Sequence, residues 1–189
     1  MARRHDISDT LPDFVRPGLR VLAVGINPSP HAVRAGYPFA FPRNRFWPAL
    51  NASRLLDAPL VPSVAAMKVL RDRYGIGFTD VVKRPTPGVR DLARRDFAAA
   101  VPLLGEKITR LAPRVLWFHG MVAARAVCRE LAPADVVAGW GEQPYLVAGT
   151  RSWVSPNPSP ANARFSLAEL VASYDGLADV LARLDGACA

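Results

Sequence analysis

Residues 20–25 read RVLAVG, a short apolar run that ends in glycine. A run of this length and composition is typical of a buried strand. The segment after it, residues 26–42, is rich in proline and glycine and is expected to form a loop. Residues 75–82 and 114–118 are two further apolar runs of the same kind, so we expect them to be strands of the same sheet.

Segments with a helical pattern lie between these strands. Asn44 and Ser63 can each cap a helix, because their side-chain oxygens can accept a hydrogen bond from its first turn. Residues 91–111 and 120–131 also have a helical pattern, although Pro102 should break or kink the first of them. Strands and helices are therefore expected to alternate along the chain.

The C-terminal part continues this alternation. Residues 145–155 should contain one or two strand segments around Gly149, and Ser166 with Glu169 forms a capping box that starts a last helix. Such alternation predicts an α/β fold, a three-layer αβα sandwich around a short, mostly parallel central sheet. The length suits a single domain over residues 1–189, with residues 1–17 as a partly ordered N-terminal tail.

The composition is basic, with a net charge of +8 and a pI near 10.3. Such a chain attracts polyanions. The only lysines are Lys68, Lys83 and Lys107, so arginine greatly outnumbers lysine. Arginine suits phosphate because its planar fork donates hydrogen bonds in pairs. A genome that favours alanine, proline and arginine would produce the same bias. Charge alone therefore favours an anionic partner without separating nucleic acid from other anions.

Several classes of protein are disfavoured by what the sequence lacks. No apolar run is long enough to span a membrane and no signal peptide is evident, so we expect a cytoplasmic protein, associated with the nucleoid in a bacterium. Cys128 and Cys188 have no metal-ligand spacing, and His5, His31 and His119 are scattered. Neither a dinucleotide-binding glycine motif nor a P-loop is present. We therefore expect no metal and no other cofactor.

Polar residues follow the predicted strands at the edge where parallel sheets bind their ligands. Residues 26–42, 79–87 and 156–164 are expected there, and the first and last of these segments contain Asn27 and Asn157, each followed by proline. An asparagine fixed by a following proline is a well-positioned polar group. A local Asx-turn or a helix cap would also explain either asparagine on its own.

The order of these segments resembles one family of DNA-repair enzymes. Over roughly residues 20–184 the sequence resembles the mismatch-specific uracil/thymine DNA glycosylases, within the uracil-DNA glycosylase superfamily. The long motif GINPSPHAVRAGYPFAFPRNRFW at residues 25–47 carries most of the likeness. Shorter matches follow in order: Arg84-Pro85-Thr86, Trp140-Gly141, Trp153-Val154 and Pro156-Asn157-Pro158-Ser159.

This resemblance implies a DNA glycosylase that hydrolyses the N-glycosidic bond of uracil in mismatched duplex DNA and leaves an abasic site. Thymine and other 5-substituted pyrimidines are further candidate substrates. The target base would be flipped out of the duplex into a pocket. Double-stranded DNA containing uracil or a mismatched pyrimidine would be the partner. We expect a monomer, and a monofunctional enzyme, because none of the three lysines lies in a matched motif.

The resemblance also gives roles to residues around the reacting bond. Asn27 would position the attacking water, and Asn157 lies in the second active-site motif, with Ser159 beside it to bind phosphate. A wedge that fills the hole left by the flipped base would consist of Pro160, Ala161, Asn162, Ala163 and Arg164. Its apex is small here, where some members of the family carry a large apolar residue, so Arg164 is expected to compensate.

Three residues would bind the base itself. The base would stack on Phe39, and Ile26 together with Phe39 would offer backbone groups to its edge. Ala32 would lie near the 5-position, where its small side chain leaves room for a methyl group. Phe46 and Trp47, at the end of the same motif, are expected in the hydrophobic core.

Asp80 is a further catalytic candidate on chemical grounds. An asparagine amide can position a water but is a poor base, whereas a carboxylate can accept the proton and stabilise the positive charge that develops on the sugar. Asp80 stands at the predicted end of the second strand, facing the same crevice. The family often has another residue type there, so this role is not implied by the resemblance. Alternatively, Asp80 caps a turn or pairs with Lys83 or Arg84.

Three other functions compete with this prediction. A metal-dependent nuclease would need clustered carboxylates or histidines, and the sequence suggests no such cluster. A nucleotide-binding regulator would need the missing glycine motifs. A non-catalytic DNA-binding module would keep the fold and the basic surface yet release no base, and it is the stronger rival. His119, which follows the third predicted strand, could lie near DNA, but it is expected to be structural or solvated.

Overall fold

A five-stranded sheet with the order β2-β1-β3-β5-β4 forms the centre of the computed structural model, which describes residues 10–133 and 137–187. β1 (Val21–Gly25), β2 (Ile76–Asp80), β3 (Val115–His119) and β5 (Arg151–Ser155) are parallel. The two-residue β4 (Gly141–Glu142) is antiparallel to β5. The predicted mostly parallel sheet is therefore confirmed, and its four parallel strands end at one edge.

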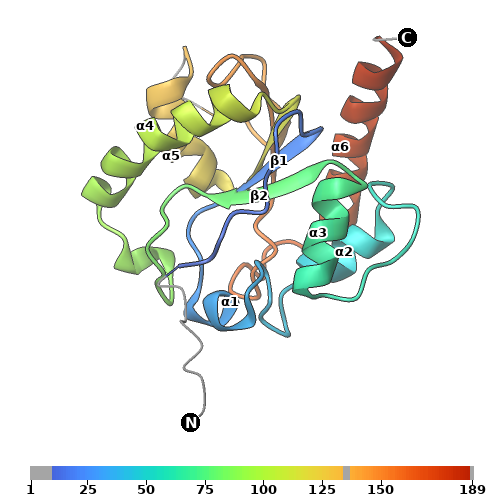
Figure 1. The fold of residues 1–189 in the computed structure, drawn as a ribbon, viewed down its shortest axis with the longest axis horizontal. Coiled ribbons are helices and arrows are strands. Elements are labelled where there is room, and N and C mark those ends of the chain that lie inside the picture. Colours follow the sequence, from blue (N-terminus) through green and yellow to red (C-terminus); the bar gives the residue numbers. More distant parts are fainter. Residues whose placement is uncertain (1–9, 134–136, 188–189) are drawn as a thin grey trace.

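Helices cover both faces of this sheet (Figure 1). On one side lie α2 (Phe46–Ala52), α3 (Val64–Asp72) and α6 (Leu167–Gly186). On the other side lie α4 (Arg94–Leu111) and α5 (Met121–Leu131). The predicted three-layer αβα sandwich is confirmed.

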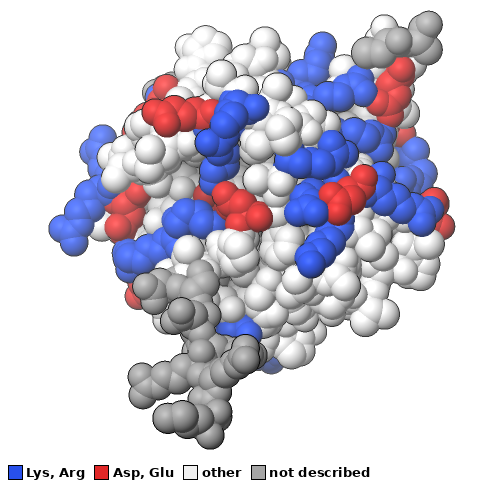
Figure 2. Space-filling view, in the orientation of Figure 1, with Lys and Arg blue, Asp and Glu red and all other residues white. Residues whose placement is uncertain are grey.

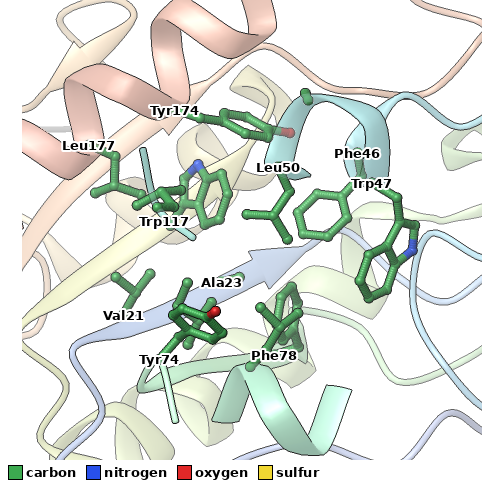
Figure 3. Close-up of a cluster of buried hydrophobic side chains, with 14 of the residues drawn as sticks. Val21, Ala23, Phe46, Trp47, Leu50, Tyr74, Phe78, Trp117, Tyr174 and Leu177 are labelled. Carbon is green, nitrogen blue, oxygen red and sulfur yellow. The ribbon is translucent and has the colours of Figure 1, made fainter. Parts of the chain in front are cut away.

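The strands alternate their side chains between two hydrophobic cores. Val21 of β1 packs with residues of α2, α3 and α6, whereas its neighbour Leu22 packs with residues of α4 and α5. The first core is rich in aromatic rings, as Figure 3 shows around Trp117. Phe46 and Trp47 belong to it and are 0% and 4% exposed, so their predicted place in the core is confirmed. This packing fixes the start of α2 close to the strand ends.

Most helix starts agree with the capping residues in the sequence. The Ser63 hydroxyl accepts a hydrogen bond from the Ala66 N–H (3.1 Å), and Ser166 with Glu169 forms the expected reciprocal capping box. Asn44 Oδ1 accepts from the backbone N–H at the first residue of α2 (2.9 Å). Residues 145–155 contain one strand, β5, which is preceded by a tight turn closed by a short antiparallel bridge.

The segment after β1 contains a short helix in place of an uninterrupted loop. α1 (Pro30–Ala35) begins where the Ser29 hydroxyl accepts a hydrogen bond from the Ala32 N–H (3.1 Å). Proline at the first helical position is preorganised for the helix, and Gly36 ends it with a φ of 78°. The expectation of a loop over residues 26–42 was wrong for these residues, because the sequence carries both a start and a stop signal.

The fourth helix runs without a break through its internal proline. α4 begins at Arg94, after a single 3-10 turn at Val89–Asp91, and continues through Pro102 to Leu111. The predicted break at Pro102 is therefore wrong. Pro102 and Ala98, whose carbonyl loses its helical partner, are both exposed, so water can satisfy the freed carbonyl.

The chain before β1 is packed against the sheet. Among residues 10–17, which we placed in a partly ordered tail, Phe14 exchanges two backbone hydrogen bonds with Phe78 of β2 (3.0 and 2.9 Å). Leu11 and Phe14 are also buried. An apolar pair spaced three residues apart was the sequence signal for this contact. The N-terminal segment thereby closes one wall of the pocket described next.

Candidate active site

A pocket of about 760 Å³ opens at the edge where the four parallel strands end. Each strand, or the segment directly after it, contributes at least one polar residue to the lining: Asn27 after β1, Asp80 at the end of β2, His119 at the end of β3 and Asn157 after β5. In Figure 1 the loop that follows β5, drawn in orange, lies beside α1. The three segments that the sequence placed at this edge are therefore brought together, and β3 adds a fourth contribution.

Asn27 is anchored through its side-chain nitrogen. Nδ2 donates to Thr86 Oγ1 (2.8 Å) and to the carbonyls of Arg84 (3.1 Å) and Pro28 (3.3 Å). The Thr86 hydroxyl in turn donates to the carbonyl of Gly88 (2.7 Å). In the described part of the chain no donor reaches Asn27 Oδ1, so the Asx-turn interpretation is wrong for this residue. Thr86, which the sequence analysis quoted without a role, orients the Asn27 amide.

The Asp80 carboxylate lies against Gly25 of the neighbouring strand β1. Gly25 lies opposite Asp80 in the β1–β2 register, and a Cβ at Gly25 would stand 2.4 Å from Asp80 Oδ1. Only glycine fits there without displacing the carboxylate. Among the described residues nothing hydrogen-bonds or ion-pairs with the Asp80 carboxylate; Lys83 pairs with Asp13 and Arg84 pairs with Asp96. The alternative that Asp80 pairs with one of these cations is therefore wrong, and burial raises the pKa of Asp80 to about 6.

A second acid takes up the lysine charges near Asp80. Asp13 binds Lys83 Nζ at 2.8 Å and Lys107 Nζ at 2.5 Å, and it accepts a hydrogen bond from the Thr79 hydroxyl (2.8 Å). Burial alone would raise the pKa of Asp13, but hydrogen bonds and charges from Lys107 and Lys83 hold it below its usual value. Asp13 therefore offsets part of the positive charge of the two lysines, and burial outweighs their remaining effect on Asp80, whose pKa is raised to about 6.

His119 is a pocket residue that the sequence analysis did not assign. It is 2% exposed and lines the pocket, so the solvated alternative for His119 is wrong, whereas its burial agrees with the structural one. Neither ring nitrogen has a partner among the described residues. Its ring packs against Phe39 and Trp117, with centroids 5.0 and 4.4 Å apart. Burial lowers the pKa of His119 to about 3, so the imidazole is neutral and offers one donor and one acceptor. Its place at a strand end was the available signal.

Three residues expected to bind the base form an apolar wall. Phe39, Ile26 and Ala32 all line the pocket. One face of the Phe39 ring stacks on Phe46 (centroids 4.2 Å apart), and this packing holds Phe39 at a φ of 58°, which a residue with a side chain rarely adopts. The Ile26 carbonyl already accepts a hydrogen bond from the Val82 N–H (2.9 Å). Such a wall suits one face of a flat ring.

Asn157 is held differently from Asn27. Its side-chain oxygen accepts a hydrogen bond from the Ser159 N–H (2.9 Å), so for this asparagine the local-turn interpretation is confirmed. Gly120 lies against it, with φ at 99° and space for a Cβ only 3.1 Å from Asn157 Cβ. Asn157 and Ser159 both line the pocket. Asn157 therefore shapes the loop after β5 as well as contributing to the lining.

The predicted wedge lies beside the pocket, and we call its five residues, 160–164, the ridge. Ala161 and Asn162 line the pocket; the remaining wedge residues, Pro160, Ala163 and Arg164, lie outside its lining. All of them are exposed except Asn162, which is half-buried. The Arg164 guanidinium lies over the Phe165 ring, 5.6 Å from its centroid. The ridge therefore carries one positive charge, on Arg164, beside small side chains.

The comparison with known families agrees with this arrangement. Residues 12–178 match the family model of the Uracil DNA glycosylase superfamily. The chain belongs to the uracil DNA glycosylase superfamily. A solved relative in fold is the solution NMR structure of a protein from Methanosarcina acetivorans that has been proposed to be a uracil DNA glycosylase. It is 21% identical with a TM-score of 0.54, covering 89% of this chain and 96% of that one.

Membership in the uracil DNA glycosylase superfamily supports a DNA-repair function of the uracil DNA glycosylase type. On the face of this superfamily member shown in Figure 2, basic side chains are widely spread and interleaved with acidic ones. The net charge of +8 is therefore not gathered into a single basic patch on that face.

The described residues of this superfamily member offer neither a metal site nor a membrane span. Among residues 10–133 and 137–187, no group of three or more His, Cys, Asp or Glu side chains could hold a metal ion. Over the same residues no helix is long and apolar enough to cross a membrane. Cys128 is a buried free thiol, whereas Cys188 and His5 lie outside the described residues.

Proposed function

We propose that this protein is a monofunctional glycosylase that flips uracil out of mismatched duplex DNA, hydrolyses its N-glycosidic bond and leaves an abasic site. The observation that carries the proposal is the pairing, in one pocket, of the anchored Asn27 amide with the unpartnered Asp80 carboxylate. Superfamily membership supports the type of reaction. The two residues supply what hydrolysis of this bond requires, a held water and a base.

The attacking water is held between these two side chains. Asn27 Oδ1, which no described residue engages, accepts one of its hydrogen bonds, and the Asp80 carboxylate accepts the other. The water oxygen then forms a bond to the sugar carbon while the carbon–nitrogen bond breaks and its electron pair leaves on the base. The water proton passes to Asp80, whose charge also stabilises the positive sugar. Asp80 must therefore be ionised before the reaction.

The departing base leaves as an anion and needs hydrogen-bond donors around its oxygens. A neutral His119 can donate one N–H without a partner being displaced. Phe39 offers a ring already backed by Phe46, so that the flipped base stacks on a rigid surface. Ala32 at the pocket wall leaves room at the 5-position, so thymine and other 5-substituted pyrimidines are proposed as further substrates.

The monofunctional assignment follows from the state of the lysines. Cutting the strand by Schiff-base chemistry requires a free nucleophilic amine. Lys83 and Lys107, the lysines near Asp80, are both ion-paired with Asp13, so neither amine is free to attack. We also propose a cytoplasmic monomer that needs no metal or other cofactor and whose partner is double-stranded DNA.

One assay tests this function. The protein is incubated with duplexes that carry uracil opposite guanine, uracil opposite adenine or thymine opposite guanine, and abasic sites and free base are measured with a chelator present. We expect uracil to be released and the abasic strand to remain uncut. Binding without release of base would favour the non-catalytic DNA-binding module instead. Activity that needs a divalent ion, or a borohydride-trapped covalent complex, would contradict the proposed chemistry.

A further inference from the structure

Arg45 connects the first motif to the loop after β5. Its backbone N–H donates to the carbonyl of Pro158 (3.1 Å). Its guanidinium reaches three more carbonyls of the same loop, those of Ser159 (3.1 Å), Asn162 (2.6 Å) and Phe165. Four carbonyls of one eight-residue segment therefore converge on a single residue. We call residues 158–165 the clamped loop.

The clamped loop has no regular secondary structure to hold its own shape. Inside it, Asn162 N–H donates to the Ser159 carbonyl and Asn162 Nδ2 donates to the Asn157 carbonyl (both 2.9 Å). The remaining inward carbonyls depend on Arg45, whose planar guanidinium can serve several acceptors at fixed angles. Hydrogen bonds from a charged donor are stronger than neutral ones, and Arg45 is partly buried. The loop is thus shaped from within before any DNA binds.

The position of Arg45 links this loop to the base-binding wall. Arg45 is the residue before α2, and its neighbour Phe46 is the ring on which Phe39 stacks. On the other side, the clamped loop carries Ala161 and Asn162 into the pocket lining. One short segment therefore sets the distance between the surface that receives a base and the ridge beside it.

The apex of that ridge is small. Ala161 and Ala163 are exposed and flank Asn162, so no large apolar side chain is available to enter the base stack. A small apex can fill the space left by a base only if the backbone itself enters and stays in place. Ordering a flexible loop inside the duplex would cost conformational entropy, whereas a loop already held by four hydrogen bonds would avoid that cost.

We propose that Arg45 is a positioning residue that holds the clamped loop rigid, so that its backbone opens the duplex without a bulky apex side chain. This inference rests on the proposed function. It concerns the opening of the duplex and not the hydrolysis that follows. Loss of the clamp should therefore slow excision from paired DNA much more than excision from a single strand, where the base is already unstacked.

The test compares Arg45→Lys with the wild type on one uracil-containing strand, used alone and paired with guanine opposite uracil. Lysine keeps the charge but lacks the planar fork, so it cannot serve the same carbonyls. Single-turnover rates on both substrates are measured on the same preparation, so that any inactive fraction cancels in their ratio. We expect the duplex to single-strand rate ratio to fall by on the order of tenfold.

Arg54→Lys is the matched control. Arg54 follows α2 at its other end and binds Asp179 on α6 (2.7 Å), with no contact to the clamped loop. It should leave the rate ratio unchanged even if its melting temperature falls. Pro160→Gly loosens the clamped loop without altering the core, so it should lower the same ratio and serves as the test if Arg45→Lys does not fold.

The outcomes separate this inference from the proposed function. If the wild type releases uracil from neither substrate, the proposed function is contradicted, and the inference with it. If the wild type releases uracil and Arg45→Lys slows both substrates equally, or slows neither, only the proposed role of Arg45 is overturned. A selective loss on the duplex would support it.

Discussion

Asp13 and Asp80 lie on either side of Thr79 at the end of β2, yet the surroundings of the two carboxylates are opposite in kind. Asp13 binds two lysines and a hydroxyl, which hold its pKa below the usual value. Asp80 has no hydrogen-bonded or ion-paired partner among the described residues, and burial raises its pKa to about 6. A folded protein gains stability from the first arrangement and loses some through the second.

The difference shows where the chain gives up stability for chemistry. Buried polar groups are almost always satisfied, so an unsatisfied one in a pocket marks a functional site. His119 is such a group, and the half-buried Asp80 carboxylate, which has no hydrogen-bond or ion-pair partner among the described residues, lines the same pocket. Asp13, Lys83 and Lys107 satisfy one another beside it. We therefore propose that the first pair serves the reaction and that the second group serves the fold.

The largest expected effect is that of Asp80→Asn, which keeps the shape of the side chain but removes the base. Single-turnover excision of uracil should fall by on the order of 100-fold, as is typical for loss of a general base. Binding to DNA should not weaken, because one negative charge near phosphate is lost. Asp91→Asn is the control, since Asp91 lines the same pocket but is engaged by the Gly88 N–H (3.1 Å), and it should excise at close to the wild-type rate.

Replacing His119 should have a smaller effect of the same kind. His119→Phe fills the same apolar surroundings without a donor, so excision should slow by at most about 100-fold, the lower end of the loss seen when one donor to a developing anion is removed. The melting temperature should hold or rise, because an unsatisfied buried polar group is removed. Ser152→Ala removes another buried and unpartnered polar atom, outside the pocket lining, and should leave the rate unchanged. A melting temperature that falls sharply in His119→Phe would indicate a structural role instead.

Substitution of Asp80 and substitution of Asp13 should change the unfolding free energy in opposite directions. Because the folded-state pKa of Asp80 is raised, its cost to stability appears as the pH rises from about 4 to about 6 and persists above it. Asp80→Asn should therefore raise the unfolding free energy by about 1–3 kcal/mol at pH 7, with no gain at pH 3. Asp13→Asn leaves two lysines without their acid and should lower the unfolding free energy by about 1–3 kcal/mol at pH 7. Denaturant unfolding at both pH values measures this contrast, and a loss in both variants would contradict it.

The smallest expected effect is a shift in the pH dependence of excision. The negative charge of Asp13 raises the pKa of Asp80, whereas Lys83 and Lys107 lower it. Asp13→Asn should therefore move the lower limb of the profile to lower pH, and Lys107→Met should move it to higher pH. Shifts in the same direction for both variants would show that the charges do not act on the catalytic group.

The fold was largely predictable because its signals are local. Apolar runs such as residues 20–25 gave the strands, and the capping residues Ser63 and Ser166 gave two helix starts. The errors arose where solvent or tertiary contacts decide. Pro102 is tolerated because its side of α4 is exposed, and Phe14 is ordered only through its pairing with Phe78.

The candidate site was predictable in its members but not in their states. The sequence pointed to Asn27 and Asn157 equally, and only the fold shows that one amide oxygen is free and the other closes a local turn. Asp80 was found by chemistry and position, but its lack of a partner depends on Asp13, which lies far away in sequence. His119 was missed because no motif contains it, and its burial against Phe39 is a tertiary property.

The pH dependence of single-turnover excision tests most directly whether Asp80 is the base. For the wild type we predict a rate that falls about tenfold per pH unit below an apparent pKa of about 6 and is level above it, because His119 stays neutral throughout this range. Asp80→Asn should give a low rate without that limb. A wild-type rate that does not change between pH 5 and pH 8, or an Asp80→Asn rate equal to the wild type, would contradict the assignment and leave Asn27 as the principal residue acting on the water.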